Sequence, residues 1–310
     1  MRILVTGSNG LLGQKLVEAL RQDQEVKLIA TSRGEDRTPV RGPGQAPDPG
    51  GYIYLPLDCT DEAAVHRGFD ETHPDAVIHT AAMTNVDACE LDPAACQLQN
   101  VTAVAHLVSA SKNISAHFIH LSTDFIFDGK SGPYSEEDRP NPLSIYGQSK
   151  WDAERIVIDS GLPKWAIART IIVYGIAKGL SRSNVVLWAK GALEKGQPIN
   201  VVEDQWRMPT LAEDLADGCI RIAKRGAVGI YNVCGPDGMS ILELVQRVGR
   251  FFDLDPSVII PVTSESLAQP AKRPPHTGFI LDKSRRDLGY APKSFEEGLA
   301  VLREQLQQPA

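Results

Sequence analysis

Short apolar runs alternate with segments of helical spacing along the first half of the chain. Residues 2–6 (RILVT) form the first run, and apolar residues then recur three or four positions apart as far as Leu20. The alternation continues and predicts strands at residues 26–32, 52–58, 76–82, 117–127 and 165–175. Helices are predicted between them, at residues 61–72, 91–112 and 146–160. Strands separated by helices indicate an α/β fold with a doubly wound parallel sheet, covered on both faces.

Two parts of the chain depart from this regular alternation. Residues 33–51 are so rich in Pro and Gly that no helix crosses them, and a long surface loop is expected there. Beyond Gly175 the helix-like segments follow at irregular intervals, at residues 183–195, 240–252 and 294–308. We therefore predict a main domain and a smaller C-terminal α/β lobe. The main domain comprises residues 1–173 with a return of the chain at 211–232, and the lobe comprises residues 174–210 and 233–310.

The composition is that of an ordinary globular protein and argues against several other classes. Of the 310 residues, 42% are hydrophobic and 23% are charged. The formal net charge of -7 argues against a nucleic-acid partner, because binding phosphates needs clustered Lys and Arg. Five cysteines without a C-x-x-C pair indicate no zinc site and no disulfide framework, and they favour a cytoplasmic protein. No apolar run reaches about 18 residues, so no membrane span is expected.

Three glycines follow the first predicted strand and open the first predicted helix. They stand in TGSNGLLG, where glycine lets the backbone turn tightly and lets a pyrophosphate approach the amides of a helix N-terminus. The G-x-x-G-x-x-G spacing is weak by itself, and its position between strand and helix makes it specific. The main domain is therefore predicted to be a Rossmann dinucleotide-binding domain. Its cofactor contacts are expected from Gly7, Ser8, Asn9, Gly10, Leu11, Leu12 and Gly13.

The ends of the second and third predicted strands bear on which dinucleotide binds. NAD sites usually place an acidic residue after the second strand, whereas this chain has Ser32 and Arg33 there. An arginine suits a ribose 2′-phosphate, so NADPH is the expected cofactor and NADH the alternative. A solvated loop charge is the competing interpretation of Arg33. Asp58 and Cys59 are expected near the adenine, although Asp58 is equally suited to cap the helix that starts near Asp61.

Tyr146 and Lys150 lie four residues apart in YGQSK, where a predicted helix begins, so their side chains share one helix face. A tyrosine is a poor acid at neutral pH, and a neighbouring ammonium group is expected to lower its pKa. Tyr146 is then suited to protonate a carbonyl oxygen while Lys150 binds the nicotinamide ribose. Thr123 lies near the carboxyl end of the strand at 117–127, the edge where open α/β sheets bind ligands, and is expected to polarise the carbonyl. A surface Tyr-Lys pair is the alternative.

These motifs resemble the extended short-chain dehydrogenase/reductases and, among them, the dTDP-4-dehydrorhamnose reductases. The resemblance covers nearly the whole chain, and its most specific stretches are STDFIFDG and YGQSK. It rests on TGSNGLLG (6–13), HTAAMTNVDACE (79–90), LSTDFIFDG (121–129), NPLSIYGQSK (141–150), RTIIVYG (169–175), DQWRMPT (204–210) and RPPHTGFILD (273–282).

The resemblance implies a reaction and a set of roles. It implies NAD(P)H-dependent reduction of the 4-keto group of a nucleotide-linked deoxysugar, dTDP-4-dehydro-L-rhamnose being converted to dTDP-L-rhamnose. Thr123, Tyr146 and Lys150 match the catalytic triad of the family. Ala81 and Ala82 match residues that line the cofactor. Thr84 and Val86 match residues near the nicotinamide and the sugar.

Arg207 and Arg273 are candidates for contacts with the diphosphate of the substrate, since guanidinium groups suit phosphate oxygens. Ordinary ion pairing is the alternative for both. Ile172, at the expected sugar site, stands where the rhamnose-pathway reductases carry a tryptophan, and Trp206 with Arg207 stands where they often have smaller residues. The substrate is therefore less firmly indicated than the class of reaction.

Two other functions share these motifs. The first is a sugar-nucleotide epimerase or dehydratase, which keeps its cofactor through the catalytic cycle. The second is a cofactor-binding regulatory subunit similar to the beta subunit of methionine adenosyltransferase. A metal-dependent hydrolase is disfavoured, because the seven histidines show no H-E-x-x-H or comparable spacing. The sequence leaves the oligomeric state open, a homodimer included.

Overall fold

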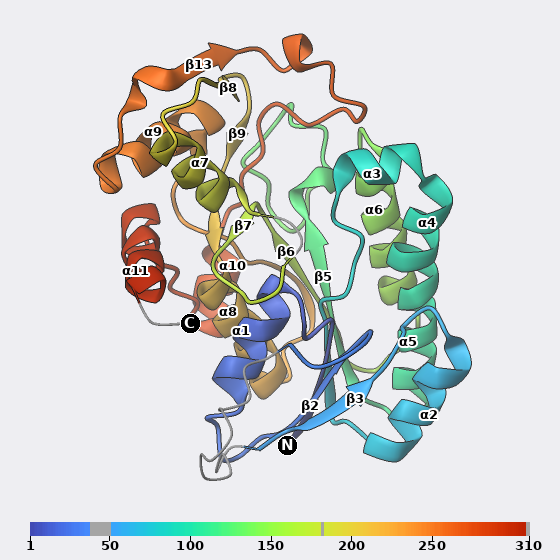
Figure 1. Cartoon of the computed structure of the whole chain (residues 1–310). Coiled ribbons are helices and arrows are strands. Elements are labelled where there is room, and N and C mark those ends of the chain that lie inside the picture. Colours follow the sequence, from blue (N-terminus) through green and yellow to red (C-terminus); the bar gives the residue numbers. More distant parts are fainter. Residues whose placement is uncertain (38–50, 181–182, 308–310) are drawn as a thin grey trace.

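A seven-stranded parallel sheet forms the centre of the described part of the chain, residues 1–37, 51–180 and 183–307 of the computed structural model (Figure 1). The strands follow the order β11-β6-β5-β4-β1-β2-β3, and every neighbouring pair is parallel. Their bounds are Arg2–Thr6 (β1), Lys27–Ser32 (β2), Ile53–Pro56 (β3), Ala76–His79 (β4), His117–Thr123 (β5), Trp165–Thr170 (β6) and Gly229–Asn232 (β11). The predicted doubly wound parallel sheet is confirmed.

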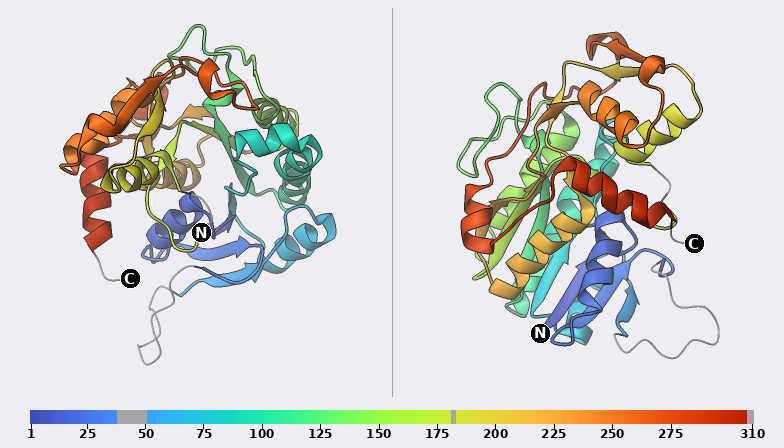
Figure 2. Two further views of the ribbon diagram at one scale, coloured as in Figure 1. Left: turned by 45° about the horizontal axis from the view of Figure 1, so that its top comes forward. Right: turned by 90° about the vertical axis from the view of Figure 1, so that its left-hand side faces the viewer.

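Helices cover both faces of this sheet, as Figures 1 and 2 show. Because both faces are buried, the strands are mainly apolar, and Ile3, Leu4 and Val5 of β1 are fully buried. Ile3 and Val5 join the core on one face and Leu4 the core on the other, as the alternation of a strand requires. The first face carries α1 (Leu11–Leu20), α8 (Ala212–Arg225) and α10 (Asp282–Leu288); the second carries α2 (Glu62–Thr72), α5 (Ala103–Asn113) and α6 (Ile145–Ile158).

The helix predicted at residues 91–112 is a series of shorter helices. It comprises α3 (Val86–Leu91), α4 (Pro93–Gln97), a π-helical turn η1 (Leu98–Thr102) and α5. Pro93 has no amide hydrogen to donate, so it begins a new helix, and the Asp92 side chain caps that helix by accepting from Ala95 N at 3.0 Å. The break turns α3 toward the carboxyl edge of the sheet.

Two predicted strands end earlier than their apolar pattern indicated. The strand at 117–127 stops at Thr123, because residues Asp124–Ile126 form a 3₁₀ turn, η2. The strand at 165–175 is divided at Ile172, whose φ of 30° is unfavourable for a β-branched residue. The part beyond this kink, β7 (Val173–Tyr174), pairs with β10 (Thr210–Leu211) outside the main sheet.

A smaller lobe lies above the carboxyl edge of the sheet (Figure 1). Its core is apolar and joins Val186 of α7, Leu244 of α9 and Leu299 of α11. Its short strands carried too little periodicity to be predicted. The elements are α7 (Val185–Glu194), α9 (Ile241–Phe251), α11 (Phe295–Gln307), β8 (Ile199–Val202), β9 (Trp206–Arg207), β12 (Met239–Ser240), β13 (Ile259–Val262), and the 3₁₀ turns η3 (Pro256–Val258) and η4 (Glu265–Leu267).

The chain crosses between the two parts more than once. It returns to the main sheet at β11, which pairs with β6. After α9 it crosses back again, because α10 packs on α8 and β11, and Leu288 and Tyr290 belong to a core of the main sheet. Most of the surface loop predicted at residues 33–51, namely 38–50, lies outside the described residues. Within the described ranges, no helix has both the length and the hydrophobicity to span a membrane.

Candidate active site

The glycine turn brings the start of α1 close to β4. Gly7 has a φ of +69°, and a Cβ there would lie 2.7 Å from the Ala81 amide nitrogen. A Cβ at Gly13 would lie 2.2 Å from the Gly7 carbonyl oxygen, whereas one at Gly10 would meet that oxygen at 3.2 Å. Gly7 and Gly13 are thus required by close backbone approach. Gly10 begins the helix as its N-cap, and Leu11 and Leu12 form the first turn of α1.

The residues between these glycines fasten the turn to its surroundings. The Ser8 amide donates to Thr31 O at 3.0 Å, and the buried Ser8 hydroxyl has no hydrogen-bond partner among the described residues. Asn9 donates to Glu35 O and accepts from Arg37 N, both at 2.8 Å, so its side chain holds the segment that follows β2. The Asn9 side chain, for which a cofactor contact was predicted, therefore has a structural role in this turn.

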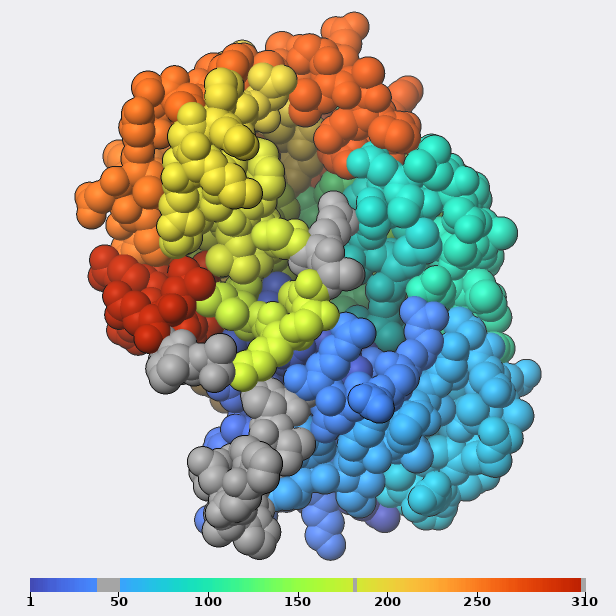
Figure 3. Space-filling view, viewed as in Figure 1, coloured from blue at the N-terminus to red at the C-terminus, as the bar shows by residue number. Residues whose placement is uncertain are grey.

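The segment after β7 lies against the same turn. Gln14 of α1 donates to Lys178 O at 2.8 Å and accepts from Lys178 N at 2.9 Å, and Arg37 donates to Gly179 O at 2.8 Å. Figure 3 shows this yellow-green stretch beside the blue N-terminal part of the molecule. A chain segment of the lobe is thereby tied to the start of the main domain.

A cavity of about 210 Å³ opens beside the glycine turn at the carboxyl edge of the sheet. The structure brings together many of the residues predicted to contact a cofactor; Gly7, Gly10, Ser32, Arg33, Asp58, Cys59, Ala81 and Ala82 all line it. Sequence reasoning missed the other lining residues, which except for Thr80 lie outside the motifs of the resemblance; they are Leu57, Thr60, Thr80, Gln99 and Ala103.

Asp58 faces this cavity as a carboxylate. Burial raises its pKa. The Thr60 amide at 2.9 Å and the Thr60 hydroxyl at 2.8 Å donate to the carboxylate, and the positive charge of Arg33 also favours the ionised form. The pKa of Asp58 is therefore lowered overall. The cap of α2 is Asp61, which accepts from Ala64 N, so Asp58 does not have that role. Burial raises the pKa of the neighbouring Cys59 to about 12, which keeps the thiol protonated.

The start of α6 places Tyr146 against the turn that follows β5. Ser144 caps the helix by accepting from Gly147 N at 3.2 Å. A Cβ at Gly147 would lie 2.2 Å from Phe125 O, so only glycine allows α6 to approach η2 this closely. The buried Tyr146 ring packs edge-on against Phe125, with ring centroids 5.7 Å apart.

Lys150 is buried one turn further along α6, and its Nζ lies 3.2 Å from Nε2 of His120. Burial lowers the pKa of Lys150 to about 8, although the Glu154 carboxylate acts in the opposite direction. The sequence predicted that Lys150 lowers the pKa of Tyr146. The structure differs, because burial raises the pKa of Tyr146 well above its usual value.

Thr123 ends β5 beside Tyr146 and is held by its own neighbours. Its hydroxyl donates to Asp124 Oδ1 at 3.1 Å and accepts from Phe125 N at 3.3 Å. Burial raises the pKa of Asp124, against the opposing charge of Arg207. Asp124 also accepts from the Thr277 hydroxyl, so this buried carboxyl joins the active-site turn to a segment far along the chain.

Arg207 differs from its expected role as a diphosphate contact. The side chain is only 1% exposed, and its Nε lies 3.6 Å from Asp124 Oδ2. Its remaining N–H groups point to acceptors within the protein; these are Trp206 O, Pro274 O, Pro275 O and Gln205 Oε1. With its donors engaged in this way, Arg207 supports Asp124 and the lobe.

Arg273 forms an ion pair that links the lobe to α3. Its guanidinium donates to both carboxylate oxygens of Asp87, at 2.7 and 3.1 Å, and also to Ala271 O. Near this pair, Thr84 is exposed and Val86 is the first residue of α3. Ile172, also expected at the sugar site, is half-buried at the kink between β6 and β7 and accepts from Thr210 N through its carbonyl oxygen.

Asn100 is a further residue that sequence reasoning missed. From η1 its amide oxygen accepts from Met83 N at 2.8 Å, and its amide nitrogen donates to Met83 O and to Ser149 Oγ, both at 3.0 Å. Ser149 in turn donates to Tyr146 O at 2.8 Å. Asn100 thus fixes the loop after β4 to the helix of Tyr146. In the sequence, the one signal for Asn100 was a polar residue on an otherwise apolar helix face.

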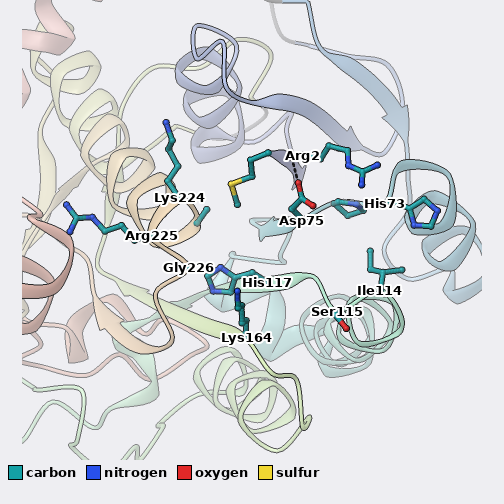
Figure 4. Close-up of a pocket in the computed structure, with 13 residues that line it drawn as sticks. Arg2, His73, Asp75, Ile114, Ser115, His117, Lys164, Lys224, Arg225 and Gly226 are labelled. Carbon is teal, nitrogen blue, oxygen red and sulfur yellow. Dashed lines mark hydrogen bonds between the residues drawn. The ribbon is translucent and has the colours of Figure 1, made fainter.

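A larger cavity, of about 670 Å³, lies at the opposite, amino-terminal edge of the sheet (Figure 4). Among its lining side chains, Lys224 is bound by the Asp23 carboxylate at 2.6 Å, and Asp75 accepts from the Arg2 amide at 2.7 Å. It contains neither the glycine turn nor the Tyr-Lys pair. No cluster of three metal-ligating side chains occurs in the ranges that the structure covers.

Comparison with known proteins identifies the family. The family model described as RmlD substrate binding domain matches residues 1–308. A probable dTDP-4,6-dihydroxy-2-methyloxan-3-one 4-ketoreductase of Streptomyces antibioticus is 33% identical over 94% of this chain and 90% of its own length. The dTDP-4-dehydrorhamnose reductase of Streptomyces griseus is 32% identical over 92% of this chain and 86% of its own length.

Two other relatives show the range of this similarity. Methionine adenosyltransferase 2 subunit beta of Xenopus laevis is 30% identical over 85% of this chain and 76% of its own length. The solved structure of dTDP-4-dehydrorhamnose reductase from Bacillus anthracis in complex with NADP superimposes with a TM-score of 0.81 at 26% identity, covering 98% of this chain and 99% of that one. The resemblance noted in the sequence is confirmed, and the chain belongs to the family described as RmlD substrate binding domain, within the extended short-chain dehydrogenase/reductases.

Proposed function

We propose that this chain is an NADPH-dependent reductase of the 4-keto group of a nucleotide-linked deoxysugar, with dTDP-4-dehydro-L-rhamnose as substrate. The observation that carries the proposal is the grouping of Thr123, Tyr146 and Lys150 at the carboxyl edge of the sheet, beside a glycine turn. Thr123 lies two residues before Phe125, on whose ring Tyr146 packs. Relatives named as a 4-ketoreductase and a dTDP-4-dehydrorhamnose reductase support this class of substrate.

The residues around the glycine turn fit a dinucleotide. A side chain at Gly7 or Gly13 would fill the space where the backbone of the turn lies closest to its neighbours. The unpartnered hydroxyl of Ser8 provides a buried polar group there. Arg33 and Asp58 line the adjoining cavity and would hold the adenosine end. A bound NADPH supplies the hydride for the reduction.

The remaining chemistry belongs to side chains of this chain. Tyr146 donates its phenolic proton to the carbonyl oxygen of the sugar, and Thr123 polarises that carbonyl by turning its hydroxyl hydrogen from Asp124 Oδ1 to the carbonyl oxygen. A raised pKa keeps Tyr146 protonated before the reaction, as a proton donor requires. The Lys150 ammonium stabilises the phenolate that remains, and it holds the nicotinamide ribose.

The reaction is expected to slow as pH rises through about 8, the pKa of Lys150. A cation whose pKa is lowered loses its charge at a lower pH than an exposed lysine, and the Tyr146 phenolate then loses its stabilising partner. The measurement is the pH profile of kcat/KM between pH 6 and 10. A rate that stays constant up to pH 10 would contradict this role for Lys150.

Replacing Arg33 by Ala is expected to raise KM for NADPH about tenfold and to leave KM for NADH nearly unchanged, because a charged hydrogen bond to the 2′-phosphate is lost. Steady-state kinetics with each cofactor measures both values. Arg37→Ala is the matched control, since Arg37 follows the same strand and its side chain bonds to Gly179 O. If the wild-type protein binds NADH ten-fold tighter than NADPH, the role of Arg33 is wrong.

The proposed function is tested by incubating the protein with NADPH and dTDP-4-dehydro-L-rhamnose. Oxidation of NADPH, followed as loss of absorbance at 340 nm, is expected together with formation of dTDP-L-rhamnose. A rate no higher than that of the Tyr146→Phe variant would reject the function. An epimerase or dehydratase would instead turn over without added cofactor and purify with oxidised NAD.

A regulatory subunit is the second candidate. It is supported by the 30% identity to methionine adenosyltransferase 2 subunit beta, over 85% of this chain. A protein of this kind would bind NADPH without turning over any nucleotide sugar. Pull-down of a stoichiometric partner enzyme whose kinetics then change would favour it over the reductase.

A further inference from the structure

Two buried histidines lie directly behind Lys150. His79 ends β4 and His120 lies in the neighbouring strand β5, at paired positions of the ladder. Their rings are stacked, with centroids 5.6 Å apart and planes at 24°. His120 is fully buried and His79 is 2% exposed, so neither ring reaches solvent.

Each ring uses one nitrogen and leaves the other without a partner. Nε2 of His120 lies 3.2 Å from Lys150 Nζ, and Nδ1 of His79 lies 2.7 Å from Thr6 Oγ1. His120 Nδ1 and His79 Nε2 have no hydrogen-bond partner in the described ranges. A buried polar atom without a partner is unfavourable, so packing alone would be served better by apolar residues here. The contact with Lys150 accounts for a polar side chain at position 120.

The groups that face Lys150 leave His120 as its acceptor. On its own helix, Tyr146 is protonated and the Glu154 carboxylate accepts two hydrogen bonds from the buried Arg169 guanidinium. Cys96 of α4 faces it from the neighbouring helix. From the strands, His120 and His79 face it, and burial together with the Lys150 charge lowers their pKa, that of His79 to about 3. Both rings are therefore neutral at working pH.

We propose that His120 is a positioning residue for Lys150, its neutral Nε2 accepting one hydrogen bond from the ammonium group while the stacked His79 fixes the orientation of the His120 ring. An ammonium has three N–H donors, so a bond to His120 leaves two for the ribose hydroxyls of a bound nicotinamide nucleotide. The inference rests on the proposed function only in that it requires this cofactor. It requires the Nδ1–H tautomer of His120.

The tautomer is tested directly by long-range ¹H–¹⁵N correlation spectra of the wild-type protein, with the His120 signals assigned by their loss in His120→Gln. His120 is expected as the neutral Nδ1–H form throughout pH 6 to 9. An Nε2–H tautomer, or titration near the ordinary histidine pKa of about 6.5, would overturn the proposal, because Nε2 would then donate instead of accepting.

Three variants separate positioning from packing, with NADPH affinity measured by fluorescence titration. His120→Leu removes the acceptor, His120→Gln keeps an oxygen acceptor near the Nε2 position, and His117→Leu changes another buried histidine of β5 that is remote from Lys150. The dissociation constant of NADPH at pH 8 is expected to rise about tenfold in His120→Leu and less than twofold in the other two.

The pH dependence of NADPH affinity is a second measurement, and it would not change if His120 served only for packing. Loss of the acceptor disfavours the charged form of Lys150, so its pKa falls and NADPH binding weakens at a lower pH in His120→Leu than in the wild type. In His120→Gln the profile is expected to match the wild type. Equal losses in His120→Leu and His120→Gln, or no change in either, would overturn the proposal.

NADPH binding needs no sugar, so the two proposals fail separately. If NADPH binds with the expected dependence on residue 120 but no nucleotide sugar is reduced, the reductase function is rejected and the positioning role stands. If the sugar is reduced but His120→Leu binds NADPH as tightly as His117→Leu, the positioning role is rejected and the function stands.

Discussion

Replacing Tyr146 by Phe is expected to lower kcat for keto-sugar reduction about 10³-fold, in the range that a positioned general acid contributes. The aromatic ring that packs on Phe125 is retained, so the change removes the hydroxyl group and little else. KM for NADPH and the melting temperature are expected to stay near their wild-type values. Stopped-flow or steady-state measurement of NADPH oxidation gives kcat.

Tyr134→Phe is the control for that experiment. Tyr134 is also buried, and its hydroxyl bonds to Asp128, beyond the end of η2. Its kcat is expected to remain within twofold of the wild type. A Tyr146→Phe variant that retains more than a tenth of the wild-type kcat would show that another group supplies the proton.

Replacing Glu154 by Ala is expected to lower the free energy of unfolding by about 3–5 kcal/mol, because it leaves a buried guanidinium without its carboxylate. Arg169 is 1% exposed and Glu154 fully buried, and two hydrogen bonds of 3.0 and 2.7 Å join them across α6 and β6. Urea unfolding followed by circular dichroism measures the change.

The same helix offers a matched control. Arg155→Ala breaks the exposed pair with Asp152 one position away and is expected to cost about 0–1 kcal/mol. A loss for Glu154→Ala no larger than that for Arg155→Ala would mean that the Arg169 charge finds another partner or reaches water.

The sequence was sufficient for features that depend on neighbouring residues. The strand and helix alternation, the glycine turn and the Tyr146–Lys150 spacing are all local patterns, and the apolar runs of a sheet buried on both faces are easily recognised. The helix break at Pro93 was also local, and its signal was present in the residues. The helical periodicity of residues 91–112 continues past this proline and so indicates one helix where the structure has several.

The contacts that the sequence did not predict join residues far apart in the chain. Thr277 and Asp124 are separated by 153 positions, and no motif connects them. The burial of Arg207 depends on how the lobe folds over η2, so its guanidinium could not be recognised as a structural group from its neighbours in DQWRMPT. The direction of the Tyr146 pKa shift was mistaken for a similar reason, because burial depends on the whole fold.

The close contact between Gly147 and Phe125 packs the backbone of the turn after β5 directly against the start of α6. The backbone positions of Thr123 and Tyr146 are consequently set by contact of one main chain with the other. Such a site is preorganised, because the entropy cost of ordering its backbone arises during folding and not at each turnover. Exchanging residues 124–127 would therefore also shift Tyr146, so the proposed proton donor is not repositioned independently of this turn.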